Sequence, residues 1–131
     1  MKFKIDTKEK FSVFTPQEQD LSANMTDKLR ILLMDCLKNP LPNLVLNMKE
    51  VYVLSTEAGE MLPEVQQEFY EKGHSFVICE LKPELEEQLD QAGILEVLNI
   101  TPTESEAWDI VQMEEIEREL LGDDNVDNPE N

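Results

Sequence analysis

Short apolar runs recur along the chain and predict five β-strands. Two of them, Leu44-Val45-Leu46 and Phe76-Val77-Ile78-Cys79, are uninterrupted, as expected of strands that are covered on both faces. The first two strands are separated by a short polar segment, a pattern typical of a hairpin. The predicted strands cover residues 3–5, 11–14, 44–46, 75–79 and 95–100, and a further apolar run at 51–54 is expected to line the core.

Between the strands, apolar residues recur at spacings of three and four and predict four helices. Ser22 can cap the first helix, and either Ser55 or Thr56 can cap the second. Pro83 suits the first turn of the third helix, and Thr103 begins a capping-box pattern before the fourth. The predicted helices cover roughly residues 22–38, 57–72, 83–93 and 103–121.

This order of elements predicts an α/β fold with a mostly parallel central sheet of about five strands and about four helices, because repeated strand–helix–strand units form crossover connections. Residues 1–121 are expected to form a single domain. Residues 122–131 lack hydrophobic periodicity and are rich in acids, so they are predicted to be a disordered acidic tail.

The charge of the chain narrows the class of partner. The chain holds 11 Lys and Arg against 29 Asp and Glu, which gives a net charge of −18. Phosphates repel such a surface, so nucleic acid and anionic membranes are poor partners for it as a whole. Residues 114–131 hold eight acids and a single base, Arg118, so the acidity is concentrated towards the end of the chain.

The apolar segments and the cysteines indicate where in the cell the protein is located. No apolar run approaches the roughly 18 residues that are needed to span a bilayer. The first residues lack the apolar core of a signal peptide. Cys36 and Cys79 have apolar neighbours and are expected to be buried, reduced thiols. The sequence therefore predicts a cytoplasmic protein.

Candidate catalytic groups are few. His74 is the only histidine; it follows Gly73 in a predicted turn, and no activated nucleophile accompanies it. Glu57, Glu60 and Glu64 cluster near one helix start, where acids are favoured by the helix dipole as well as by acid–base chemistry. His and Cys residues are not clustered as a metal site requires, and the glycines form no phosphate-binding loop. We expect no catalytic residues, no metal and no cofactor.

The stretch from residue 44 to residue 62 carries a resemblance to a known family. A buried strand ends at Asn47, an apolar run follows at 51–54, and a helix begins after Ser55. This order resembles the STAS domain, the fold of bacterial anti-sigma factor antagonists, in which Asp-Ser-Ser-Gly opens the helix. Similarity extends over roughly residues 2–112 and includes the strand at 76–78, Pro83, Leu89, Ala92-Gly93-Ile94 and Val97.

The resemblance implies a role for each residue at this helix start. Without gaps, Ser55 takes the place of the motif Asp, Thr56 that of the first Ser, Glu57 that of the phosphoacceptor Ser, and Ala58 that of the Gly. In the family, an anti-sigma factor with a kinase-like ATPase fold phosphorylates the serine, and the phosphate blocks binding to that kinase. Glu57 cannot be phosphorylated, which implies a permanent negative charge or a lost switch; a register shifted by one makes Thr56 the candidate acceptor. Without the resemblance, Ser55 or Thr56 is simply a helix cap and Glu57 a favourable first-turn acid.

The resemblance thus implies a non-enzymatic protein-interaction domain of the anti-sigma factor antagonist type that lacks the usual phosphoserine switch. Its partner is expected to be a protein, in particular an anti-sigma factor with a kinase-like ATPase fold. The expected contact surface consists of Ser22, Asn24, Ser55, Thr56, Glu57 and Ala58.

Two alternatives remain open at this point. STAS-like domains also form structural subunits of larger complexes or transporter assemblies, and the acidic fourth helix and tail then provide a docking element for a basic partner. A small-ligand carrier or enzyme is the other alternative, because the carboxyl edges of parallel sheets bind ligands. The absence of a paired nucleophile and base in the sequence argues against an enzyme.

Overall fold

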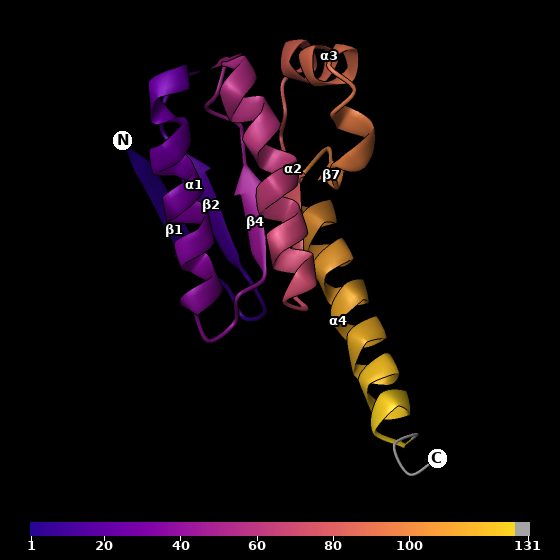
Figure 1. Cartoon of the computed structure of the whole chain (residues 1–131). Helices are drawn as coiled ribbons and strands as arrows, with labels where there is room; N and C mark the ends of the chain where they lie inside the picture. Colours follow the sequence, from indigo (N-terminus) through magenta and orange to yellow (C-terminus); the bar gives the residue numbers. More distant parts are fainter. Residues whose placement is uncertain (128–131) are drawn as a thin grey trace.

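The structure is a computed structural model that describes residues 1–127. Its centre is a five-stranded sheet in the order β1-β2-β4-β6-β7 (Figure 1). β1 pairs with β2 in an antiparallel hairpin, and the other neighbours are parallel. The strands are β1 (Phe3–Thr7), β2 (Ser12–Pro16), β4 (Leu44–Asn47), β6 (Phe76–Cys79) and β7 (Ile100–Thr101). The α/β fold with a mostly parallel central sheet, predicted from the sequence, is confirmed.

A second, smaller sheet lies at the carboxyl edge of the first. It consists of β3 (Asp20–Leu21) and β5 (Val53–Leu54), which pair in parallel so that Leu21 lies opposite Leu54. Strand β3 was not among the strands predicted from the sequence. Its pairing with β5 brings the segment before the first helix next to the segment before the second helix.

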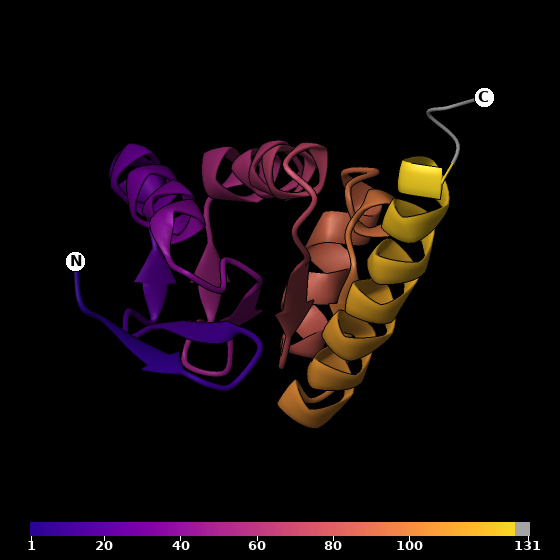
Figure 2. The same cartoon turned by 90° about the horizontal axis from the view of Figure 1, so that it is seen from below.

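Helices cover both faces of the central sheet, with α4 on the face opposite α1 and α2 (Figure 2). Short 3₁₀ turns precede and follow α1. The helices are α1 (Thr26–Asp35), α2 (Thr56–Glu71), α3 (Pro83–Gln91) and α4 (Glu104–Asp127), and the 3₁₀ turns are η1 (Ala23–Met25), η2 (Cys36–Lys38) and η3 (Leu95–Val97).

Strand β4 shows why the sheet needs both helical layers. Leu44 and Leu46 belong to the larger core cluster beneath α1, α2 and α3, whereas Val45 belongs to the smaller cluster beneath α4. Successive side chains of a strand point to opposite faces, so a strand that is apolar at every position requires two covers. All three side chains are fully buried, which confirms the prediction made from the uninterrupted run.

Helix α4 is attached to the sheet by few apolar contacts and by a polar cluster. Ala107 and Val111 are its fully buried apolar residues. Further along, the Glu114 carboxylate accepts hydrogen bonds from the Tyr70 hydroxyl (2.7 Å) and from the Ser75 hydroxyl (2.6 Å). Burial is the main cause that raises the pKa of Tyr70, with Glu114 adding to it, so the phenol remains protonated and remains a donor.

The same cluster holds the next turn of α4. The Asn43 side-chain amide donates to the Glu115 carboxylate (2.6 Å), and Arg118 donates to the Ser75 hydroxyl (3.0 Å) and to Glu115 (3.3 Å). The Asn43 hydrogen bond and Arg118 lower the pKa of Glu115 below its ordinary value. Asn43 and Ser75 directly precede β4 and β6, so this polar cluster joins α4 to the amino edge of the sheet.

Several boundaries differ from the sequence predictions. Residues 95–97, expected to begin the last strand, form a 3₁₀ turn, and the strand itself is limited to Ile100–Thr101. Within the run at 51–54, Val51 and Leu54 are buried, but Tyr52 and Val53 are more than half exposed. Helix α4 continues past Leu121 to Asp127, so it ends later than predicted; residues 128–131 of the expected tail lie outside the described residues.

No helix in the described part of the chain is both long enough and apolar enough to cross a bilayer.

Candidate functional site

The start of α2 is fixed by two hydrogen bonds of Ser55. Its side-chain oxygen accepts a hydrogen bond from the backbone N–H of Ala58 (3.0 Å), and its extended backbone (φ −67°, ψ 156°) is that of an N-cap. Its own N–H donates to the Leu21 carbonyl (2.9 Å). Of the two candidate caps, the structure selects Ser55. The first turn of α2 is therefore held in a defined position beside the small sheet.

Thr56 and Glu57 occupy the exposed side of this first turn. The Glu57 carboxylate lies where the unpaired N–H groups of the helix create a positive potential, which stabilises a negative charge. Its side chain forms no ion pair among the described residues. The carboxylate is thus exposed and available for contact.

Ala58 does not belong to the exposed surface. Its side chain is only 1 % exposed and packs in the larger core cluster. The expectation that Ala58 contacts a partner is therefore wrong. A helix turns by about 100° per residue, so the residue after the exposed Glu57 faces the core. The helical spacing of the buried residues Ala58, Met61, Leu62, Val65 and Phe69 carried this signal in the sequence.

Ser22 and Asn24 lie beside this helix start, although they are far from it in sequence. Ser22 directly follows Leu21, the residue that pairs with Leu54 in the small sheet. Its hydroxyl donates to the side-chain oxygen of Asn24 and does not cap the first helix. The predicted contact residues Ser22, Asn24, Ser55, Thr56 and Glu57 are thereby brought to one end of the molecule.

A groove between α1 and α2 continues this surface. It encloses about 380 Å³ and is bordered by three acids of α2, Glu57, Glu60 and Glu64. Arg30 of α1 bridges Asp27 (3.1 Å) and Glu64 (3.0 Å). The one base in the groove is already paired, so the groove presents a negative surface. Sequence reasoning missed Asp27 and Arg30, because only tertiary packing places α1 against α2.

Two exposed apolar residues extend the site on its other side. Tyr52 and Val53, which precede Leu54 and the cap residue Ser55, are 57 % and 54 % exposed. The Lys82 ammonium lies 4.4 Å from the centre of the Tyr52 ring and donates to the Lys49 carbonyl (2.7 Å). We call Ser22, Asn24, Tyr52, Val53, Ser55, Thr56 and Glu57, with the acidic groove, the α2 surface.

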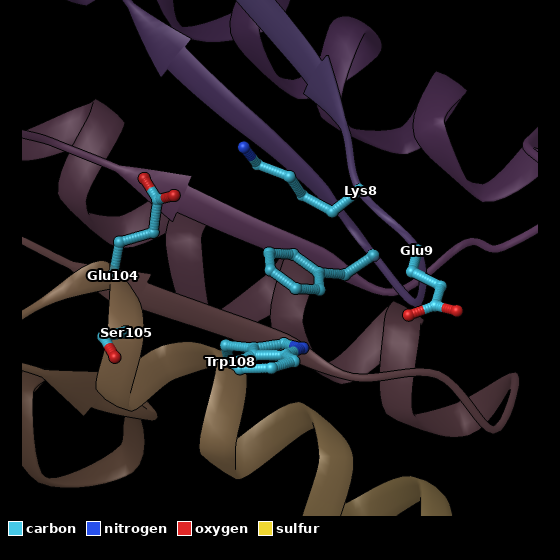
Figure 3. A pocket seen from close by; sticks show the side chains of 6 residues that line it. Lys8, Glu9, Glu104, Ser105 and Trp108 are labelled. Carbon is cyan, nitrogen blue, oxygen red and sulfur yellow. The ribbon is translucent and has the colours of Figure 1, made fainter.

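A second hollow lies on the opposite face of the sheet, beside the first turn of α4 (Figure 3). It encloses about 330 Å³ between the β1–β2 hairpin, with Lys8 and Glu9, and the helix, with Ser105 and Trp108. Trp108 is 40 % exposed and lines this hollow. Ser105 follows β7 at the carboxyl edge, whereas His74 precedes β6 at the amino edge, so the two do not form a nucleophile–base pair.

The other potentially reactive side chains, those of two cysteines and a histidine, have a structural role. Burial is the main cause that raises the pKa of Cys36 to about 11 and that of Cys79 to about 12, so both thiols are unreactive near neutral pH. Partial burial and Arg118 lower the pKa of His74. Within the described residues, no group of His, Cys, Asp and Glu is arranged to hold a metal ion.

With the geometry established, comparison with known proteins identifies the type of domain. The family model of the STAS domain matches residues 2–107. No curated protein matches the sequence. A putative anti-sigma factor antagonist from Thermotoga maritima has a similar structure, with a TM-score of 0.75 at 15% identity over 84% of this chain and 94% of that chain.

Two further solved structures show how widely this fold is used. A Moorella thermoacetica RsbS with a serine-to-glutamate substitution gives a TM-score of 0.70 at 18% identity over 86% of this chain and 96% of that chain. The murine Solute Carrier 26 member A9 anion transporter gives 0.69 at 12% identity over 82% of this chain but only 18% of that chain. At such identities the likeness establishes the fold alone.

Proposed function

The chain belongs to the STAS domain family, and from this premise we propose that it is a non-enzymatic cytoplasmic interaction domain of the anti-sigma factor antagonist type. The observation that carries the proposal is the exposed Glu57 carboxylate in the first turn of α2, beside Ser22 and Asn24. The anti-sigma factor antagonist among its structural neighbours supports a protein partner.

The α2 surface supports binding of a basic protein face. Its groove holds four acids, and the one base among its lining residues, Arg30, already pairs with two of them. Beside the acids, Tyr52 and Val53 offer apolar contact area at the same end of the molecule. Acids beside apolar residues steer a positively charged partner to the surface, and burial of the apolar side chains then adds to the binding energy. We propose an anti-sigma factor with a kinase-like ATPase fold as this partner.

The proposal includes the loss of the phosphoserine switch. Glu57 has no hydroxyl, and its carboxylate carries about half the charge of a phosphate. Thr56 is exposed beside it and is the alternative acceptor. We assign Glu57 a permanent charge that is too small to block binding as a phosphate does and that keeps the surface competent to bind, and we assign Thr56 no modification.

The switch proposal is tested by incubating the purified protein with ATP and the kinase-type anti-sigma factor of the same organism. Intact-mass spectrometry is expected to show an unmodified wild-type protein, because position 57 offers no acceptor oxygen. Glu57→Ser restores a hydroxyl in the same first turn and is expected to gain one phosphate at residue 57. Stoichiometric phosphate on Thr56 in the wild type contradicts the proposal.

Binding at the α2 surface is tested by reversing the charge of residue 57. Glu57→Lys is expected to weaken the complex with this anti-sigma factor at least about tenfold, which equals about 1.4 kcal/mol, because a basic partner face is then repelled. Isothermal titration calorimetry measures the change in affinity. The matched control is Glu84→Lys, which changes an exposed first-turn acid of α3 by the same charge. Equal weakening by both variants attributes the effect to net charge and refutes a specific contact at residue 57.

A further inference from the structure

Helix α4 presents a row of apolar side chains to solvent. Met113, Ile116 and Leu120 are 49%, 58% and 62% exposed. At about 100° per residue, their spacing of three and four puts them on one side of the helix, opposite the buried residues Ala107 and Val111. We call these three residues the outer stripe. Single exposed apolar residues are common, but a row along one helix face marks a contact surface.

The outer stripe lies apart from the α2 surface. Helix α4 runs along the sheet from its carboxyl edge and continues beyond the amino edge (Figure 1). The outer stripe occupies the middle of this helix and spans about 10 Å of its axis. The α2 surface lies at the carboxyl edge, so the two surfaces can be occupied at the same time.

The charges beside the outer stripe are of one sign. Glu106, Asp109, Glu117 and Glu119 are exposed acids of α4. The one base between residues 104 and 121, Arg118, is turned towards the sheet, where it bonds to Asn43, Ser75 and Glu115. The outward side of this helix therefore combines apolar side chains with uncompensated negative charge.

We propose that the outer stripe docks a basic amphipathic helix of another protein. Apolar side chains of such a helix pack on Met113, Ile116 and Leu120, and its lysines and arginines lie against the flanking acids. Amphipathic helices recognise apolar faces of this size through apolar residues at matching spacings. A second copy of the chain brings the same acids and a charge of −18 to the contact, and like charges facing each other oppose association. An anionic membrane is repelled in the same way.

A synthetic peptide tests this proposal directly. The probe is a fluorescein-labelled helical peptide of about 18 residues, with leucines spaced three and four apart on one face and lysines and arginines on the other. Fluorescence anisotropy is expected to show saturable binding that weakens as salt is raised. The double variant Ile116→Gln with Leu120→Gln is expected to lose at least about tenfold in affinity, because two buried apolar contacts are removed. Ile31→Gln, an equally exposed residue of α1, is the matched control and is expected to bind as the wild type does.

Three results overturn the proposal. The first is equal binding of a scrambled peptide with the same composition, since only the amphipathic order distinguishes the two. The second is an absence of binding, or binding that the double variant does not change. The third is a dimer in sedimentation equilibrium that the double variant abolishes, which assigns the outer stripe to a second copy. Glu57→Lys is expected to leave peptide binding unchanged, so failure here is distinguishable from failure at the α2 surface.

Discussion

Replacing Phe69 with alanine is expected to lower the free energy of unfolding by about 3–5 kcal/mol. Phe69 of α2 is fully buried, and its ring lies 5.3 Å from that of Phe76 in β6. The substitution removes a ring contact between the second helix and the middle of the sheet and leaves a cavity that the rigid strands cannot close. Urea denaturation followed by circular dichroism measures the loss. A domain of this size has about 5–15 kcal/mol of stability in total, so the variant should be close to unfolding at 37 °C.

Ile31→Ala provides the matched control for this experiment. It also removes a large apolar side chain from a helix, but Ile31 is 63% exposed. Exposed substitutions of this kind change the free energy of unfolding by about 0.5 kcal/mol or less. If Phe69→Ala lowers the free energy of unfolding by less than about 1 kcal/mol, well below the usual cost of such cavities, the result contradicts the placement of Phe69 at the centre of the core.

Replacing Glu114 with alanine is expected to loosen α4 and to cost about 2–3 kcal/mol, since buried hydroxyls without an acceptor are expensive. The variant leaves the Ser75 hydroxyl and the Tyr70 hydroxyl without their shared acceptor. The apolar residues of α4 in the cluster beneath it, Ala107, Ile110 and Val111, all precede Glu114, so the turns of the helix from Glu114 to Arg118 depend on the polar cluster. Hydrogen exchange measured by mass spectrometry is expected to show that the variant accelerates amide exchange between residues 112 and 121 more than it accelerates exchange in α2.

Glu114→Gln separates the role of the acceptor from that of the charge. Glutamine keeps one side-chain oxygen near both hydroxyls, so its cost is expected to stay below about 1 kcal/mol. If alanine and glutamine lower the free energy of unfolding equally, the negative charge and not the hydrogen bonds holds α4 in place. If neither changes the exchange of α4, the polar cluster does not anchor the helix.

Each part of the fold that could be predicted depends on a local signal in the sequence. The uninterrupted runs in β4 and β6 predicted strands covered on both faces, since no other element of that length buries every side chain. Thr103 and Glu106 predicted the start of α4, and in the structure the Thr103 hydroxyl caps the helix: it accepts from the Glu106 backbone N–H and donates to the Glu106 carboxylate. In each case the signal lies within a few neighbouring residues.

The parts that were missed depend on residues distant in sequence. Residues 95–97 are apolar enough for a strand but form η3, whose Val97 carbonyl accepts a hydrogen bond from the Gln66 side chain of α2 (2.8 Å). Strand β5 forms only because the two-residue β3 lies beside it, so the exposure of Tyr52 and Val53 depends on a tertiary pairing. The spacing of apolar residues along the chain, whether every two or every three to four residues, carries no information on such contacts.

The candidate site divides in the same way. Ser55, Thr56 and Glu57 follow one another in sequence, and their common helix start was predictable from capping preferences. Asp27 and Arg30 join the groove only because α1 packs beside α2. The burial of Ala58 was available from its spacing with Leu62 and Val65, which a motif-by-motif alignment ignores.

The two outer strands of the central sheet have a consequence for self-assembly. β1 forms one edge and carries the exposed Lys4, which pairs with Asp6 at 3.6 Å, while β7 forms the other edge, is only two residues long and is followed by Pro102. Charged, short and proline-limited edges resist the addition of strands from neighbouring molecules, which is the usual route to fibrous aggregates. Assemblies that contain this domain should therefore grow through helix and loop contacts and not through extension of the sheet.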